Sequence, residues 1–162
     1  QETVRGLEEE VIQYRQPIES DWRPILAIVN LIVPGDEEGN QNWVENRREF
    51  DESSGRRRHH TLEEDGVVIG YGCVEESGDP GWFRMQICLP NHQLTGPIAD
   101  DLHAKLWCDL HDLGASGAWA REWATLTDVA NYFVRLGYVE TRRYSPGGRQ
   151  IIVWNKPLSE IA

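Results

Sequence analysis

The middle of the chain carries a period-two pattern of apolar residues, which restricts the chain to folds that contain an antiparallel sheet. Alternation of apolar and polar residues is typical of half-buried β-strands. Asp65-Gly66 stands between two such runs and is typical of a two-residue hairpin turn, and residues 77–81 form a second turn. The sequence therefore predicts a three-stranded antiparallel meander, with strands at 57–63, 67–74 and 82–89.

Helical spacing elsewhere predicts four helices around the meander. Pro24 fits the first turn of the first helix, and Pro34-Gly35 ends that helix. Thr127 is the predicted cap of the last helix, which Gly137 ends. The predicted helices span 22–32, 39–50, 98–113 and 127–136, and further strands are predicted at 11–15, 118–123, 138–144 and 150–154. This order predicts a mixed α/β (α+β) fold in which helices cover both faces of one sheet.

The length of the chain, 162 residues, is that of one domain. We expect this domain to span 11–157, between a lead-in arm at 1–10 and a tail at 158–162. The only methionine is Met85, so we expect the chain to be trimmed or cut from something longer.

Charge and composition exclude several classes of partner. Lysine and arginine total 16 against 27 for aspartate and glutamate, and the resulting net charge of −11 repels nucleic acid and anionic lipid. No stretch reaches the roughly 20 apolar residues that a membrane-spanning helix needs. Three widely spaced cysteines form neither a disulfide framework nor a metal-knuckle pattern, which favours a reducing, cytoplasmic location.

The histidines predict no metal site. His59 and His60 are neighbours on one predicted strand and therefore point to opposite faces, whereas His103 and His111 lie too far apart on a helix to share an ion. The only basic run, residues 56–58, either reaches an anion such as the 3′-phosphate of a nucleotide cofactor or guards a strand edge.

Three segments resemble the GNAT superfamily of acyl-CoA-dependent N-acyltransferases. They are Tyr14–Pro17 with Ser20-Asp21, Gly66–Val74, and Val129–Tyr138 with its aromatic/Leu-Gly-aromatic ending. Between them, Pro90, His92, Gln93 and Gly96 match the family's cofactor segment. The resemblance implies a divergent member with a central mixed, mostly antiparallel sheet, helices on both faces, and acetyl-CoA as cosubstrate.

In the family geometry, the strand before the cofactor segment binds the pantetheine arm, and a helix N-terminus with its free amides binds the phosphates. The resemblance places these roles on the backbone of Ile87 and Leu89 for the arm, and on Gln93, Leu94, Thr95, Gly96, Ile98 and Ala99 for the phosphates. Four features oppose binding. Leu94 stands where a glycine would allow a positive φ, Pro97 removes one amide donor, and Ile98 adds a branched side chain. Asp100 and Asp101 repel a polyanion.

The proton-transfer positions also depart from the family pattern. Many members of the family have a glutamate and a tyrosine at two positions where this chain has Met85 and Phe133, and neither of these side chains can transfer a proton. Glu122 and Tyr132 are the remaining candidates in this region. Glu122 is either a base that acts through water or a surface residue, and Tyr132 is either a proton donor or a half-buried ring turned elsewhere on its helix.

Two functions follow from the resemblance. The first is an N-acetyltransferase that uses a primary amine of a small cationic molecule, with the oxyanion stabilised by a backbone amide near Ile87. The second is a catalytically degenerate domain of the same fold that binds a ligand or dimerises, as a homodimer or one half of a tandem. Trp119 and Trp123, on either side of Arg121, line a cleft or a dimer contact, or belong to the core.

Overall fold

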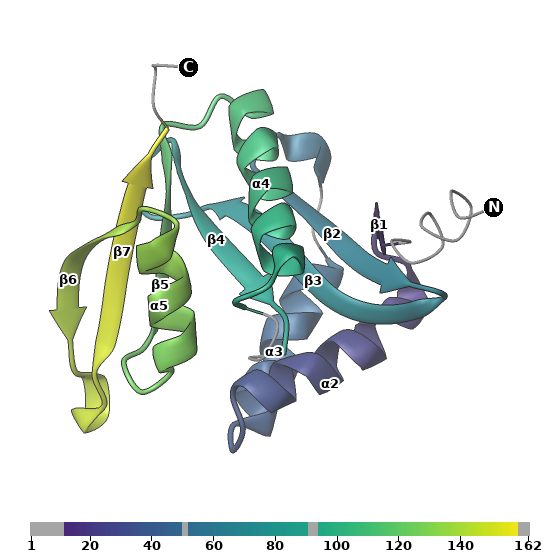
Figure 1. Cartoon of the computed structure of the whole chain (residues 1–162), viewed down its shortest axis with the longest axis horizontal. Coiled ribbons are helices and arrows are strands. Elements are labelled where there is room, and N and C mark those ends of the chain that lie inside the picture. Colours follow the sequence, from purple (N-terminus) through teal and green to yellow (C-terminus); the bar gives the residue numbers. More distant parts are fainter. Residues whose placement is uncertain (1–11, 50–51, 91–93, 159–162) are drawn as a thin grey trace.

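In the computed structural model, which describes residues 12–49, 52–90 and 94–158, helices flank both faces of one seven-stranded sheet (Figure 1). The strands are β1 (Ile12–Arg15), β2 (Arg57–Glu64), β3 (Val67–Glu76), β4 (Trp82–Cys88), β5 (Gly117–Trp123), β6 (Val139–Tyr144) and β7 (Ile151–Pro157). The helices are α2 (Trp22–Ile32), α3 (Glu37–Arg48), α4 (Pro97–Asp112) and α5 (Thr127–Arg135), with short 3-10 turns η1 (Glu19–Asp21), η2 (Glu52–Ser54) and η4 (Pro146–Gly148). The predicted mixed fold is confirmed. The predicted arm at 1–10 and tail residues 159–162 lie outside the described residues.

The predicted meander forms β2, β3 and β4. Asp65 and Gly66 both have positive φ, 53° and 82°, as the tight turn between β2 and β3 requires. The sheet order is β1-β2-β3-β4-β5-β7-β6, and only β4 and β5 run parallel. The sheet is therefore mixed and mostly antiparallel.

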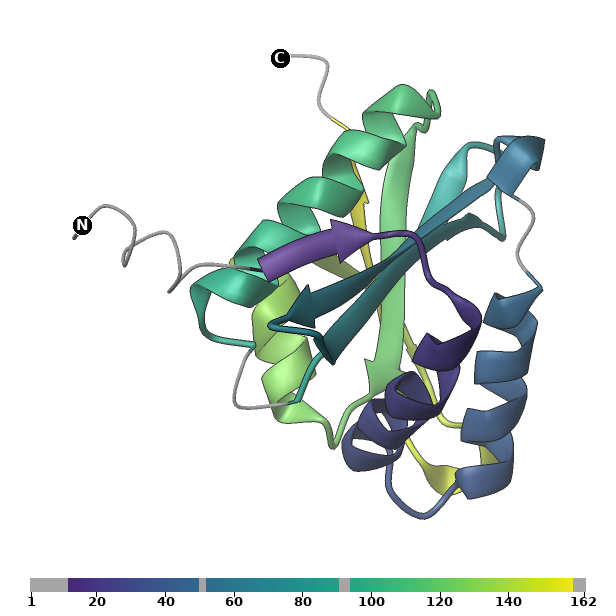
Figure 2. The ribbon, with the colours of Figure 1, turned by 90° about the vertical axis from the view of Figure 1, so that its right-hand side faces the viewer.

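Helices lie on both faces of the sheet (Figure 2), and an apolar cluster lies between the helices and the sheet on each face. Below α2 and α3 lie Tyr71, Cys73 and Cys88, and below α4 and α5 lie Leu62, Val74 and Met85. Gly72 lets α4 approach β3 closely, because an added Cβ there would lie 2.8 Å from Leu102 Cδ1.

The parallel pair β4 and β5 is joined only at one end. Its register runs from Trp82↔Gly117 to Arg84↔Trp119 and then stops. Beyond it, β4 continues against β3 and β5 continues against β7, and the two strands diverge (Figure 1). The main chain of β4 from Met85 to Cys88 therefore has no β5 partner, and the sheet opens between the two strands.

Some predicted boundaries were wrong in detail. Thr127 begins α5, but the cap position belongs to Leu126 and no side chain makes a capping hydrogen bond there. α3 begins at Glu37 rather than Gly39, because Asp36 caps it by accepting a hydrogen bond from the Gly39 N–H at 3.2 Å. Among the described helices, none combines the length and the apolar character needed to cross a membrane.

Candidate functional site

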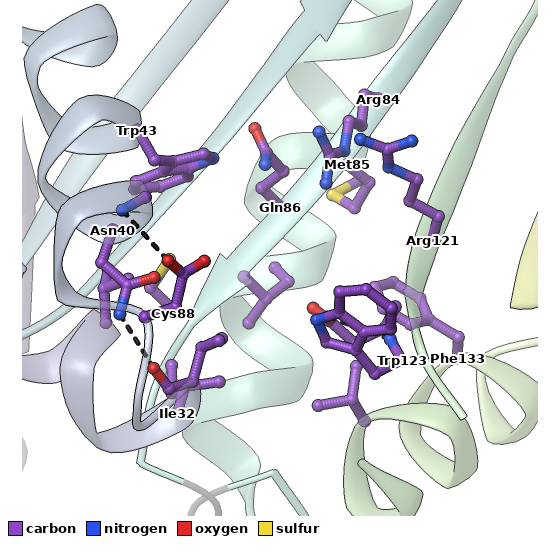
Figure 3. A pocket seen from close by; sticks show the side chains of 17 residues that line it. Ile32, Asn40, Trp43, Arg84, Met85, Gln86, Cys88, Arg121, Trp123 and Phe133 are labelled. Atoms are coloured by element: carbon purple, nitrogen blue, oxygen red, sulfur yellow. Dashed lines mark hydrogen bonds between the residues drawn. The ribbon is translucent and has the colours of Figure 1, made fainter. Parts of the chain in front are cut away.

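A pocket of about 280 Å³ lies where β4 and β5 diverge. It is lined by residues of both strands, by α2 and α3 on one side, and by α5 on the other. Figure 3 shows Arg84 and Arg121 at one end of this pocket and Asn40 at the opposite end, with Trp43 across the pocket from Trp123. We call it the β4–β5 pocket.

Alternate side chains of β4 face the two sides of the pocket. Gln86 accepts a hydrogen bond from Arg47 of α3 at 2.7 Å, and Cys88 belongs to the cluster below α2 and α3. Arg84 shares this face of the strand, whereas Met85 and Ile87 face the side that α5 covers. The β4–β5 pocket is therefore polar and cationic toward α3 and apolar toward α5.

The two positions where the resemblance calls for proton-transfer groups both line the pocket, as Met85 and Phe133. Met85 is 2% exposed, and Phe133 is 4% exposed and stacks on Trp154 with ring centroids 5.7 Å apart. Neither side chain can donate or accept a proton. Any proton transfer in this pocket must therefore use another group.

Glu122 of β5 lines the pocket and carries a carboxylate. Its Oε1 accepts a hydrogen bond from the Trp123 N–H at 3.2 Å. Burial raises the pKa of Glu122 above its ordinary value, although that N–H and the nearby Arg84 and Arg121 act in the opposite direction. A carboxylate with a raised pKa is a better proton acceptor near neutral pH, as a general base requires.

Tyr132 does not line the β4–β5 pocket. Its side chain is 2% exposed, and its hydroxyl donates a hydrogen bond to the Ala99 carbonyl at 2.7 Å. Burial, together with the nearby Asp100, raises its pKa well above the usual range. The structure thus places this hydroxyl in the contact between α5 and the first turn of α4, where it holds the two helices together.

The start of α4 lies after the residues that the structure leaves undescribed, which include the predicted cofactor residue Gln93. Gly96 occupies the cap position, and no side chain makes a capping hydrogen bond among the described residues. Leu94 has no positive φ, and its side chain, 3% exposed, points into the core together with Ala99. Pro97 is the first helical residue, where an N–H has no partner in the helix in any case.

The Leu94 side chain therefore lies in the core and does not cover this helix start, whereas Pro97 removes one of the amide donors there, as predicted. Ile98 packs partly against the core, and Thr95 is exposed. Arg135 donates hydrogen bonds to Asp100 at 2.9 Å and to the Leu94 carbonyl at 3.1 Å, so it offsets one of the two negative charges next to the helix start.

Comparison of the sequence with protein-family models and with curated protein sequences gives no match. Solved structures do match the fold. A GNAT-family protein from Desulfovibrio desulfuricans has a TM-score of 0.77 at 14% identity, over 92% of this chain and 100% of that chain. YncA from Salmonella typhimurium, whose structure contains acetyl-CoA, has a TM-score of 0.69 at 16% identity, over 94% and 97%. The ribosomal-protein-S18-alanine N-acetyltransferase of Escherichia coli has a TM-score of 0.70 at 14% identity, over 94% and 97%.

The chain has the GNAT fold. Within this fold, the structure brings Ile87, Glu122 and Trp123 of the predicted set into the β4–β5 pocket, and it places Leu89 in the core with 1% exposure. The start of α4 follows β4 directly along the chain.

Residues of α3 and of the cationic face were missed at the level of sequence. Trp43 and Asn40 line the pocket from α3, and Arg84, Gln86 and Arg121 line it from the strands. The only available signal was alternation: arginine and glutamine stand two apart on a predicted strand whose other positions are apolar. Alternation identifies a shared face, but it does not show that the neighbouring strand moves away.

The basic run 56–58 lies elsewhere. Arg56 pairs with Glu76 at 3.0 Å, and Arg58 contacts Asp109 and Asp112 of α4 at 3.4 and 3.5 Å. The described part of the chain holds no group of three histidine, cysteine or acidic side chains arranged to bind a metal ion.

Proposed function

We propose that this protein is an N-acetyltransferase of the GNAT superfamily that transfers acetyl from acetyl-CoA to a primary amine of a small molecule. The observation that carries the proposal is the unpaired edge of β4 beside the β4–β5 pocket. A strand edge offers N–H and C=O groups to an extended partner, and the amides of a pantetheine arm are such a partner. The names of the structural neighbours, and the acetyl-CoA in the YncA structure, support the same activity.

The residues at the start of α4 fit the phosphates of acetyl-CoA. The amides of Gly96, Ile98 and Ala99 belong to the turn whose N–H groups have no partner within a helix, and the helix dipole places partial positive charge there. The side chain of Leu94 is directed into the core and not toward these amides. When bound, acetyl-CoA supplies the acetyl group as a thioester.

The proposed chemistry uses the chain's own groups. The amine nitrogen forms a bond with the acetyl carbon while the C–S bond breaks. Of the two protons that an ammonium group loses, one ends on the departing thiol and the other passes through Glu122 to solvent. A backbone amide near Ile87, on the unpaired stretch of β4, stabilises the oxyanion. Met85 and Phe133 line the pocket with apolar side chains and exclude water from that part of it.

A second candidate is a domain of the same fold that binds a ligand without turnover. The absence of proton-transfer groups at Met85 and Phe133 favours it. The two candidates differ in one measurable property, because only the enzyme consumes acetyl-CoA.

Calorimetry with acetyl-CoA, followed by measurement of free-thiol release with a panel of primary amines, tests the proposal. We expect binding in the micromolar range and thiol release that depends on the amine. Gly96→Asp should abolish binding without loss of stability, because aspartate caps the helix well but repels the phosphates. Gln41→Glu, which adds the same charge on the exposed face of α3, should bind like the wild type.

Three outcomes separate the candidates. Binding with amine-dependent thiol release establishes the enzyme. Binding without turnover for any amine favours the non-catalytic domain. The absence of both heat and thermal stabilisation at high micromolar acetyl-CoA refutes the proposal.

A further inference from the structure

Arg84 is a partly buried cation that forms no ion pair with any described side chain. Its guanidinium lies 5.6 Å from the centre of the Trp119 ring, and its buried Nε has no hydrogen-bond partner among the described residues. The carboxylate of Glu122 lines the same pocket and its charge acts to raise the pKa of Arg84, but no ion pair joins the two side chains. Burial lowers the pKa of Arg84, and Arg121 and Arg47 add to this effect.

Arg121 reaches the same end of the pocket from β5, and the two guanidinium groups lie near one another (Figure 3). Arg121 donates a hydrogen bond to the Tyr144 hydroxyl at 3.0 Å and forms no ion pair among the described residues. A smaller cavity of about 130 Å³ shares Arg84, Arg121, Glu122 and Trp123 with the β4–β5 pocket, so open space adjoins both cations. We call Arg84 and Arg121 the arginine pair.

The nearby Arg47 is a buried cation that does have polar partners. It is 5% exposed, lies 4.2 Å over the Trp43 ring, and donates to Gln86 at 2.7 Å and to Glu75 at 3.4 Å. Burying a charge without such partners is costly, and this applies to the partly buried Arg84 but not to Arg121, which is exposed. The chain has a net charge of −11, and Glu122 lines both cavities, yet no described acidic side chain forms an ion pair with either member of the arginine pair.

An anion that enters the pocket would supply the missing partner. A guanidinium binds a carboxylate through two parallel hydrogen bonds, which makes this pairing strong and directional. The α2–α3 side of the pocket offers the apolar and aromatic side chains of Val29, Ile32 and Trp43, with the polar Asp36 and Asn40 beside them. The pocket therefore combines a carboxylate site with space for an apolar side chain.

We propose that the acceptor is an amino acid with an apolar side chain, whose carboxylate is bound by the arginine pair and whose amine receives the acetyl group. This inference rests on the proposed function. It also refines the expectation of a cationic acceptor, which was based on the net charge of the chain. The acidic surface favours a molecule with a cationic group, and the pocket selects one that carries a carboxylate as well.

Pairs of acceptors that differ only in the carboxylate test the inference. They are leucine against isopentylamine and phenylalanine against phenethylamine, with acetyl-CoA and free-thiol release as the assay. We expect the wild type to prefer the amino acid in each pair. Arg84→Gln should raise the KM for the amino acids by about 10- to 100-fold, the effect of losing a hydrogen bond to a charged group, and should leave the KM for the amines unchanged. Arg84→Lys should restore part of the loss.

The matched control is Arg23→Gln, which removes an exposed arginine of α2 that does not line the pocket. It should change neither KM. Equal use of amino acids and amines by the wild type, or an equal rise of KM for both in Arg84→Gln, would overturn the inference and leave the proposed function standing.

Binding of reaction products provides a readout that needs no turnover. In calorimetry without coenzyme A, we expect the wild type to bind N-acetyl-leucine and N-acetylphenylalanine but not N-isopentylacetamide. We expect Arg84→Gln to bind neither of the two acids. Product binding in a protein that acetylates no amine would refute the proposed function and support the carboxylate site. Failure of both acids to bind would overturn the inference.

Discussion

The Tyr132 hydroxyl is the test case for whether a tyrosine next to the family's proton-donor position acts in chemistry or in packing. The change is Tyr132→Phe, which removes the oxygen and keeps the ring. The hydroxyl donates to the Ala99 carbonyl at 2.7 Å, and the two residues are 2% and 0% exposed. Because Ala99 lies in α4, its carbonyl keeps a hydrogen bond within the helix and is not left without a partner.

The cost is therefore that of one buried hydrogen bond, about 1 kcal/mol. For a chain of 162 residues, a change of this size lowers Tm by roughly 2–4 °C. Thermal unfolding followed by circular dichroism measures the shift, and free-thiol release measures kcat at a temperature well below Tm. We expect the lower Tm together with unchanged kcat.

Tyr14→Phe is the control, since the Tyr14 hydroxyl makes no hydrogen bond to any described residue and burial raises its pKa to about 12. Its Tm should stay within about 1 °C of the wild type, because no hydrogen bond is lost. An unchanged Tm with a hundredfold lower kcat in Tyr132→Phe would refute the packing role and make the hydroxyl a proton donor.

Three further changes test the pocket and the scaffold. Glu122→Gln should lower kcat by about 10²- to 10⁴-fold and remove the fall in rate at acid pH, where the wild-type carboxylate takes up a proton. Because folding raises the pKa of Glu122, its charge opposes folding at neutral pH, so the variant should also unfold at a higher temperature at pH 7; a lower Tm would contradict the burial argument. Phe133→Tyr places a hydroxyl in the pocket and should raise kcat in the thiol assay, whereas an unchanged kcat would show that the hydroxyl does not reach the sulfur. Asp21→Asn weakens hydrogen bonds from Arg15 at 2.7 Å and Thr61 at 3.0 Å and should lower the free energy of unfolding in urea by about 1.5–3 kcal/mol; a change below 0.5 kcal/mol, roughly the scatter of neutral surface changes, would contradict this.

The candidate site was only partly accessible to sequence reasoning. The resemblance identified the β4 segment around Ile87 and the start of α4, because the matching residues lie in one short stretch. It also marked Met85 and Phe133 as positions without proton-transfer groups, and both line the pocket. The burial of Leu94 was not predicted, because a side chain in a loop can turn into the core, and the sequence around it does not show which way it turns.

The sequence by itself determined the helices and strands and the covering of both faces of the sheet by helices. Apolar spacing and turn residues such as Asp65-Gly66 act over a few neighbouring positions, so the period of the pattern shows which face of a strand or helix is buried. Only the tertiary structure decided where β4 and β5 stop pairing, since the hydrogen bonds that end near Arg84 and Trp119 join segments far apart in the chain. That divergence creates the pocket and leaves Arg84 partly buried without an ion pair to any described side chain, because burial and charge pairing depend on which distant side chains the fold brings together.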